Sequence, residues 1–491
     1  MTGTADSANT AETAGTASTA DSTSTADTAD TAATPRFTVV GAGLAGSLMA
    51  LYLGRRGYRV TVYERRADLR SQPDDGQGRS INLGLSARGI RALGQVGLLE
   101  RLWPLTVPMR GRVIHRPGAA PAFQAYGTEE SQILHSVLRS DLNRLLIDAA
   151  EALPNVRFVF RTRLSGLDKD QARAYVTDEA TGEERAVAAD AVIGADGVYS
   201  AVRRHLHSGE RADVHQEFMD WGYKELTIPA APDGSAQVRI EALHIWPGGA
   251  GLIVAHPNRD NSLTGTLFLP FEGEESFATL TTPEAVLGFF RARFPDAEEL
   301  IPDLLKEFDA NPVGTLVCVR TRPWHHRGRA VLIGDAAHAV YPFYGQGMNS
   351  SFEDCLELDA CIGRHPDQLE AAFREFEQMR KRHTDVLNEL SKQNFVELRD
   401  RLASPLHVAL KKADLALSKV FPTAWQPLYT MVSHTTMPYG DALERARRQD
   451  TVLKVLAAAT AAGTALALRH LVRKAVRTPS SAPSPTSKDM R

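Results

Sequence analysis

The stretch that decides the fold is FTVVGAGLAGSLMALYLGRRGYRVTVYE, residues 37–64. It opens with a short apolar run typical of a strand and continues with the glycine spacing GAGLAG. Residues 47–56 then have helical character and end at Gly57, and residues 59–63 form a second strand-like run that ends at Glu64. This order predicts a parallel βαβ unit of a Rossmann-like domain.

Each glycine of this spacing has a physical task in binding a dinucleotide. Gly41 permits the tight turn, Gly43 lets the backbone approach a pyrophosphate, and Gly46 lets the helix pack against the strand. The helix N-terminus presents free N–H groups to a phosphate, and Glu64 can accept hydrogen bonds from a ribose diol. We therefore expect FAD or NAD, whose ribose carries no 2′-phosphate.

Two later motifs favour FAD. AVIGADG at 191–197 and VLIGDAAH at 331–338 each contain an apolar run that ends near an acid, Asp196 or Asp335. The Asp335 carboxylate can accept from the ribityl hydroxyls of a flavin, and a helix expected from near Asn349 would favour electron density at a reduced flavin. The three motifs in this order resemble the flavoprotein aromatic hydroxylases. Because the sequence has no second GxGxxG, we expect NADPH only as a transient co-substrate.

Composition excludes several classes of protein. The 491 residues carry a formal net charge of -3 with 43% hydrophobic residues, which fits a soluble globular protein and gives no reason to expect a nucleic-acid partner. Three cysteines without a CxxC pair argue against disulfides and structural zinc, and fit a reducing cytoplasm. The sequence lacks G-x-S-x-G and HExxH motifs, so we predict neither a catalytic side chain nor a metal.

The predicted fold class is α/β, with a discontinuous Rossmann-like FAD-binding domain, a mostly antiparallel substrate-domain sheet and a helical C-terminal region. The Thr-, Ala- and Asp-rich beginning of the chain cannot bury enough apolar surface to offset the entropy of ordering it. In chain order we expect a tail at 1–35, the FAD-binding domain at 36–215 and 318–385, the substrate-domain sheet at 216–317, the helical region at 386–477 and a flexible tail at 478–491.

The C-terminal region contains one uncharged run, VLAAATAAGTALAL at 455–468. It is shorter than the roughly 20 strongly apolar residues that a membrane-spanning helix needs. A packed or peripheral helix is the favoured interpretation, and membrane contact through this helix is a minor alternative. A monomer and a dimer both stay open.

The sequence resembles one family within the aromatic hydroxylases, the kynurenine 3-monooxygenases, from about residue 37 to about residue 452. The resemblance implies hydroxylation of L-kynurenine to 3-hydroxykynurenine with NADPH and O2, through a C4a-hydroperoxide of tightly but non-covalently bound FAD. The stretches that carry it are GRSINL at 78–83, VPMRGR at 107–112, AYGT at 125–128, LHIWP at 243–247, FLPFE at 268–272 and PLYTM at 427–431.

The resemblance implies a clamp for the amino-acid end of the substrate, made of Arg112, Tyr126, Asn394 and Tyr429. An arginine can form a bidentate, charge-assisted pair with a carboxylate, and tyrosine and asparagine side chains can donate hydrogen bonds to it. The ring pocket beside the flavin would contain Pro342, Phe343 and Tyr344.

The resemblance also implies a set of FAD-binding residues, in addition to the three glycines of the fingerprint and the acids of the two later motifs. The Arg139 guanidinium would lie on the pyrophosphate. The remaining predicted cofactor residues are Ala45, Glu64, Arg65, Arg66, Gly84, Leu164, Gly347, Met348 and Asn349.

Three alternatives remain at this point. The chain could hydroxylate a ring-substituted kynurenine or a related aromatic amino acid in secondary metabolism. It could instead be a non-catalytic interaction protein that keeps the flavin fold, although such a protein would be expected to lose a glycine or the acid of the GD motif. A tryptophan-type halogenase would need a WxWxIP motif, and the five tryptophans do not have that spacing.

Overall fold

A computed structural model describes residues 34–71, 82–127, 132–209, 211–401 and 405–476. The predicted tails at 1–35 and 478–491 lie outside the described residues, except for Thr34 and Pro35.

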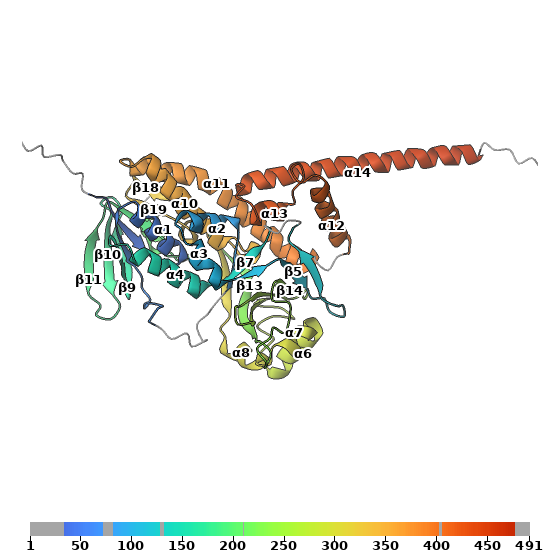
Figure 1. The fold of residues 1–491 in the computed structure, drawn as a ribbon, viewed down its shortest axis with the longest axis horizontal. Helices are drawn as coiled ribbons and strands as arrows, with labels where there is room; N and C mark the ends of the chain where they lie inside the picture. Colours follow the sequence, from blue (N-terminus) through green and yellow to red (C-terminus); the bar gives the residue numbers. More distant parts are fainter. Residues whose placement is uncertain (1–33, 72–81, 128–131, 210, 402–404, 477–491) are drawn as a thin grey trace, which may run out of the picture. The chain divides into compact units, whose positions relative to one another are not determined.

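The predicted βαβ unit is the centre of a six-stranded sheet (Figure 1). Helix α1 begins at Leu44, earlier than expected, because Gly43 already acts as its N-cap in an extended conformation. The strands pair in parallel except for β18 with β19. In the order β18-β19-β12-β1-β2-β8 they are His325–His326, Ala330–Leu332, Ala191–Gly194, Arg36–Val40, Arg59–Tyr63 and Val156–Val159.

A seven-stranded sheet contains the predicted antiparallel strands. Its strands pair antiparallel except for β14 with β5, and it also takes in β5 and β6 from an earlier part of the chain. In the order β17-β13-β16-β15-β14-β5-β6 they are Gly314–Arg322, Asp213–Ile228, Leu263–Pro270, Leu252–Pro257, Leu243–Pro247, Gly111–Ile114 and Ala122–Ala125. The limits of the domains themselves stay a prediction.

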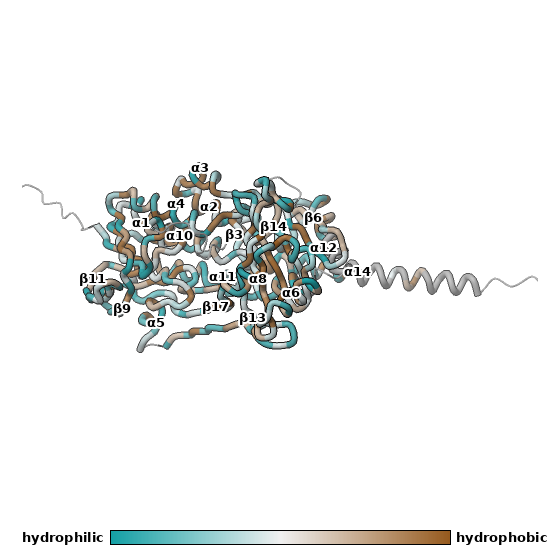
Figure 2. The backbone as a smooth tube through the Cα atoms, turned by 90° about the horizontal axis from the view of Figure 1, so that it is seen from below, coloured by the Kyte–Doolittle hydropathy of each residue, from teal (hydrophilic) through white to brown (hydrophobic). Residues whose placement is uncertain are grey.

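A hydrophobic cluster lies on one side of this seven-stranded sheet, where Trp246 of β14 packs with Phe289, Phe290 and Leu304. These partners belong to helices α6 (Pro283–Arg293) and α8 (Leu304–Ala310), with α7 (Pro295–Leu300) between them. Figure 2 shows brown, hydrophobic chain where β14, α6 and α8 lie. The helices therefore cover one face of the sheet and leave the other face to the cavity described below.

The remaining elements form two smaller sheets and the surrounding helices. Helix α11 begins at Leu369 and runs across residue 386, where the predicted helical region starts. The sheets are β3-β7-β4 (Asn82–Leu85, Leu134–Leu138, Thr106–Met109) and β11-β10-β9 (Glu184–Ala188, Arg173–Asp178, Thr162–Asp168). The helices are α1 (Leu44–Arg55), α2 (Ala87–Gln95), α3 (Leu99–Leu102), α4 (Arg139–Glu151), α5 (Ala201–His207), α9 (Asp335–His338), α10 (Gly347–Arg364), α11 (Leu369–Val396), α12 (Pro405–Val420), α13 (Leu428–Ser433) and α14 (Tyr439–Val476), with short turns η1 (Trp103–Leu105), η2 (Pro342–Tyr344) and η3 (Glu397–Arg401).

The turn between β1 and α1 is as tight as the glycine spacing predicts. Gly41 has φ +101°, a backbone conformation that favours glycine. A Cβ at Gly46 would lie 1.9 Å from the carbonyl oxygen of Gly41 and 3.2 Å from the Cβ of Ala195. The helix can therefore approach the strand only because Gly46 has no side chain.

A buried charge cluster joins α10 to α11. Arg380 on α11 donates to Asp354 at 2.7 Å and pairs with Glu353. Asp354 also accepts from the Gly334 N–H at 2.9 Å and contacts the His338 ring at 2.5 Å. Burial opposes ionisation of Asp354, but His338 and Arg380 outweigh it, so the pKa of this carboxyl lies below its ordinary value.

Helix α14 contains the uncharged run at 455–468. Among the described residues, no helix is long and apolar enough to cross a membrane.

The contact between α1 and its preceding turn generates a first prediction. In Gly46→Ala the new Cβ collides with backbone, so we expect a loss of roughly 1–3 kcal/mol together with weaker retention of the cofactor. Thermal denaturation of the purified protein measures the first effect. The matched control is Gly288→Ala on α6, where glycine is exposed and a Cβ meets nothing within 4 Å. The control should be neutral or slightly stabilising, and an equal loss in both variants would contradict the argument.

The buried charge cluster generates a second prediction. Arg380→Met removes one counter-charge from each of the buried carboxylates of Glu353 and Asp354. Because Arg88 and His338 remain beside them, the loss should be about 3 kcal/mol, at the lower end for a broken buried pair. Arg374→Met on the same helix removes only an exposed pair with Glu370, which should cost at most about 1 kcal/mol. Urea denaturation of both variants at neutral pH compares the two losses, and similar values would show that the cluster does not stabilise this region.

Candidate active site

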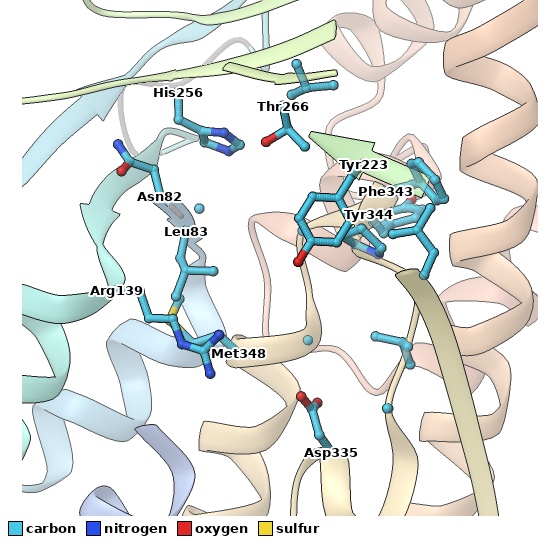
Figure 3. A pocket seen from close by; sticks show the side chains of 18 of the residues that line it. Asn82, Leu83, Arg139, Tyr223, His256, Thr266, Asp335, Phe343, Tyr344 and Met348 are labelled. Carbon is cyan, nitrogen blue, oxygen red and sulfur yellow. The ribbon is translucent and has the colours of Figure 1, made fainter. Parts of the chain in front are cut away.

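A cavity of about 440 Å³ lies between the β1–α1 turn and the free face of the seven-stranded sheet. Figure 3 shows side chains that point into it from several elements, with Asp335 and Arg139 on one side and His256 and Thr266 on the other. The predicted site residues that line it are Gly43, Ala45, Gly84, Arg112, Arg139, Asp335, Pro342, Phe343, Tyr344, Gly347, Met348, Asn394 and Tyr429.

One wall of the cavity is bare backbone. A Cβ added at Gly43, Gly84, Gly197 or Gly345 would meet no atom within 4 Å, although all four residues line the cavity. A ligand can therefore approach the main chain closely at these positions. The first turn of α1 begins here as well, and its N–H groups have no partner within the helix, so this wall suits an anionic dinucleotide.

Two charged side chains lie in this part of the cavity, Arg139 at the start of α4 and Asp335 at the start of α9. Neither hydrogen-bonds to another residue in the described ranges. The Asp335 side chain lines the cavity. Desolvation by the surrounding protein raises the pKa of its carboxyl, and the positive charge of Arg139 partly opposes the rise. The guanidinium can donate hydrogen bonds to a phosphate, and the carboxylate can accept them from the hydroxyl groups of a ribityl chain.

Glu64 stands at the end of β2, next to the glycine turn. Its carboxylate accepts from the Ala42 N–H at 2.9 Å and from Arg66 Nε at 2.8 Å. Burial opposes its ionisation, but the hydrogen bonds and charge of Arg66 outweigh this, so the pKa of Glu64 lies below its ordinary value. The carboxylate is thus an ionised acceptor beside the turn. Arg65 is exposed.

Other predicted cofactor residues lie behind the cavity wall. The amide of Asn349 donates to the carbonyls of Gly84 and Gly345 and accepts from the Ser86 N–H, so it ties β3 to the loop before α10. Asp196 accepts from the N–H groups of Ala201 and Val202 and thereby caps α5. Leu164 is buried in the core around the six-stranded sheet. The side chains of these three residues do not line the cavity.

The four predicted clamp residues come from distant parts of the chain and meet at one end of the cavity. Arg112 on β5, Asn394 on α11 and Tyr429 on α13 line it. Tyr126 packs against Tyr429, with ring centroids 5.6 Å apart. The Arg112 guanidinium lies 5.8 Å from the centre of the Tyr429 ring, and its Nε donates to Gln124 at 3.0 Å. Its terminal nitrogens make no hydrogen bond to a described residue and are available to an anion.

The polar groups beside Arg112 have distinct tasks. Asn394 donates to the carbonyl of Phe343 at 2.7 Å, so its amide nitrogen already holds the loop of the ring pocket. The Tyr126 hydroxyl is buried without a hydrogen-bond partner of acceptable geometry among the described residues. Burial and the neighbouring Tyr429 raise the pKa of Tyr126 well above its ordinary value. The phenol is therefore neutral, and its hydroxyl interacts with that of Tyr429.

A second cavity of about 110 Å³ adjoins the first on the side of α12 and α13. Four residues line both cavities, namely Arg112, Tyr344, Asn394 and Tyr429. Three clamp residues and Tyr344 therefore form the partition between the two spaces, and the fourth clamp residue, Tyr126, lines the second cavity.

The sheet wall opposite the bare backbone contains residues that the sequence analysis did not single out. Tyr223, His256, Thr264 and Thr266 line the cavity from β13, β15 and β16. The alternation of residues along each strand is the signal that could have suggested them. The alternation does not say which face of the sheet is covered by helices, and the structure decides this.

The cavity fits FAD by its own geometry. It combines open space over four glycines, a helix N-terminus, an arginine that pairs with none of the described residues and a carboxylate that lines the cavity. It also continues to a cationic end with two tyrosines, which suits a carboxylate ligand beside the cofactor. The predicted ring-pocket residues Pro342, Phe343 and Tyr344 line the same cavity.

Comparison with known sequences agrees with this assignment. The model of the FAD binding domain family matches residues 35–363. Kynurenine 3-monooxygenase of Salinispora arenicola is 56% identical over 88% of this chain and 96% of its own length. The enzyme of the same name from Myxococcus xanthus is 44% identical over 85% of this chain and 90% of its own length.

Solved structures with the same fold include two oxygenases. The tetrameric form of 2-methyl-3-hydroxypyridine-5-carboxylic acid oxygenase gives a TM-score of 0.61 at 22% identity and covers 77% of this chain and 95% of its own. PqsL from Pseudomonas aeruginosa gives 0.60 at 22% identity and covers 75% and 97%. At this identity the likeness concerns the fold alone, and it confirms the predicted α/β architecture. On the sequence comparisons, this chain belongs to the kynurenine 3-monooxygenase family of FAD-dependent monooxygenases.

Proposed function

We propose that the protein hydroxylates L-kynurenine to 3-hydroxykynurenine, with FAD as bound cofactor and NADPH and O2 as co-substrates. The observation that carries the proposal is the unpaired cationic end of Arg112 in the same cavity as the cofactor wall. The names of the relatives support the same reaction.

In this proposal, the side chains bind and orient while bound FAD supplies the reduction and oxygen-transfer chemistry. Arg112 pairs with the substrate carboxylate, and the hydroxyls of Tyr126 and Tyr429 donate to it. Holding the amino-acid end fixes the position of the aromatic ring beside Pro342 and Phe343, which lowers the entropic part of the barrier. Asn394 acts mainly by holding the Phe343 carbonyl.

The predicted cofactor residues fall into three groups in this proposal. Backbone at Gly43, Ala45, Gly84, Gly347 and Met348 would contact FAD directly, together with the side chains of Arg139 and Asp335. Gly41, Gly46, Leu164, Asp196 and Asn349 would shape the wall from behind. Glu64, with Arg65 and Arg66 next to it, would serve the ribose end.

A second candidate is a kynurenine that carries a further polar group on its ring. The polar side chain of His256 on the sheet wall favours it, because a further polar group on the ring could pair with the imidazole. We also infer a cytoplasmic enzyme that acts as a monomer or dimer.

The direct test measures NADPH oxidation by the purified flavoprotein with and without L-kynurenine, together with product analysis. We expect strong stimulation and formation of 3-hydroxykynurenine. Stimulation that yields only hydrogen peroxide would favour the ring-substituted substrate. Absence of bound FAD, or no response to any aromatic amino acid, would contradict the proposed function.

The clamp predicts a specific effect of charge at position 112. Arg112→Met removes a charge-assisted pair, so KM for kynurenine should rise by about tenfold to a hundredfold, and more NADPH should be oxidised without product. Arg110→Met is the matched control, since this exposed arginine pairs only with exposed Glu241. Steady-state kinetics that show the same change in both variants would sink the clamp assignment.

A further inference from the structure

His256 on β15 is a polar side chain in the cavity wall that has no task in the clamp or in the cofactor wall. Val254 and His256 both line the cavity, as alternating residues of one strand do. No hydrogen bond joins the His256 ring to another residue in the described ranges. Burial lowers the pKa of His256 to about 4. The imidazole is therefore uncharged near pH 7, so one ring nitrogen is a donor and the other is an acceptor. The ring lines the cavity.

The register of the sheet places His256 relative to the clamp. Arg112 on β5 pairs with Leu243 on β14. The pairing of His244 with Ala255 then brings Leu243 opposite His256 on β15. Since neighbouring strands lie 4.7–4.9 Å apart, the Cα atoms of Arg112 and His256 are about 10 Å apart in one cross-strand row. Both side chains are on the cavity face, because both line the cavity.

This spacing matches the two ends of an aromatic amino acid of the kynurenine type. If the substrate carboxylate pairs with Arg112 and the rest of the molecule lies along this cross-strand row, its aromatic ring lies beside His256. In kynurenine, one N–H of the ring amine turns toward the neighbouring ketone, and the other N–H points away from it. That second N–H is a free donor on the aromatic end, where the cavity offers a free acceptor.

We propose that the imidazole of His256 is a specificity-determining group, which recognises the aromatic end of the substrate by accepting a hydrogen bond from an N–H or O–H on its ring. The inference rests on the proposed function and adds a second polar anchor to it. Figure 3 shows His256 and Thr266 together on the side of the cavity opposite Asp335. Arg112 at the other end of the row is cationic and binds the carboxylate, whereas His256 binds the donor group on the ring.

The surroundings of His256 make its acceptor nitrogen selective for a ring that carries a hydrogen-bond donor. The neighbouring wall residues Leu243, Ile245 and Val254 are apolar. The hydroxyl of Thr264, opposite His256 on β16, already accepts from Asn258 at 3.1 Å. A ring without a donor would leave the imidazole unpaired in an enclosed site, which weakens binding of that ring relative to one that donates.

The test compares two ligands on the FAD-loaded enzyme. Dissociation constants are measured without oxygen, from the change in flavin absorbance, for L-kynurenine and for the same amino acid with an unsubstituted phenyl ring. The wild type should prefer kynurenine, and His256→Leu should reduce that preference by about threefold to tenfold, the range expected for one neutral hydrogen bond. His256→Asn keeps an acceptor and should retain part of the preference.

Thr266→Val is the matched control, because it removes a polar group from the same wall and leaves the imidazole in place. It should leave the ratio of the two dissociation constants unchanged. An unchanged ratio in His256→Leu, or a ratio that falls only in Thr266→Val, overturns the assignment to His256. A wild type that binds neither ligand instead overturns the proposed function, so the two failures are distinguishable.

Discussion

The buried carboxylate of Asp354 fixes the part of the molecule on which the site depends. It accepts from the Gly334 N–H, contacts His338 and is neutralised by Arg380 from the next helix. A buried charge is tolerable only when its partners satisfy it. Because these partners lie on both sides of Asp335, at Gly334 and His338, and on α11, the carboxylate holds these segments together. The contacts of Asp354 thereby fix the backbone from which the Asp335 side chain enters the cavity.

The cavity has two walls built on different principles. The wall toward the six-stranded sheet exposes main chain, since glycines leave open space where side chains would project. The wall made by the seven-stranded sheet consists of side chains from alternating strand positions. A planar cofactor with a phosphate chain needs the first kind of surface, and selection among small aromatic ligands needs the second. Arg112 belongs to the second wall and supplies its cationic end.

Local residues allowed the cofactor half to be predicted from the sequence. The tasks of Gly41 and Gly46 follow from a turn and a helix that are adjacent in the chain, so spacing alone expresses them. The clamp was predicted only through the resemblance to a family, because Arg112 lies hundreds of residues before Asn394 and Tyr429. Asn349 and Asp196 stay predicted cofactor residues, and their side chains hold neighbouring backbone. Their tasks depend on partners that spacing does not reveal.

The sequence by itself determined the βαβ unit, its glycine turn and the acid that follows, because short-range sterics and hydrogen bonding leave few alternatives there. It also determined which strands carry residues that alternate between the two faces of a sheet. Only the tertiary structure decided which face of the seven-stranded sheet meets the cavity, since the packing of α6 and α8 covers the other face. That choice places Arg112 and His256 on the same side and in one row. The physical reason is that a strand specifies two faces equally, and long-range burial alone selects between them.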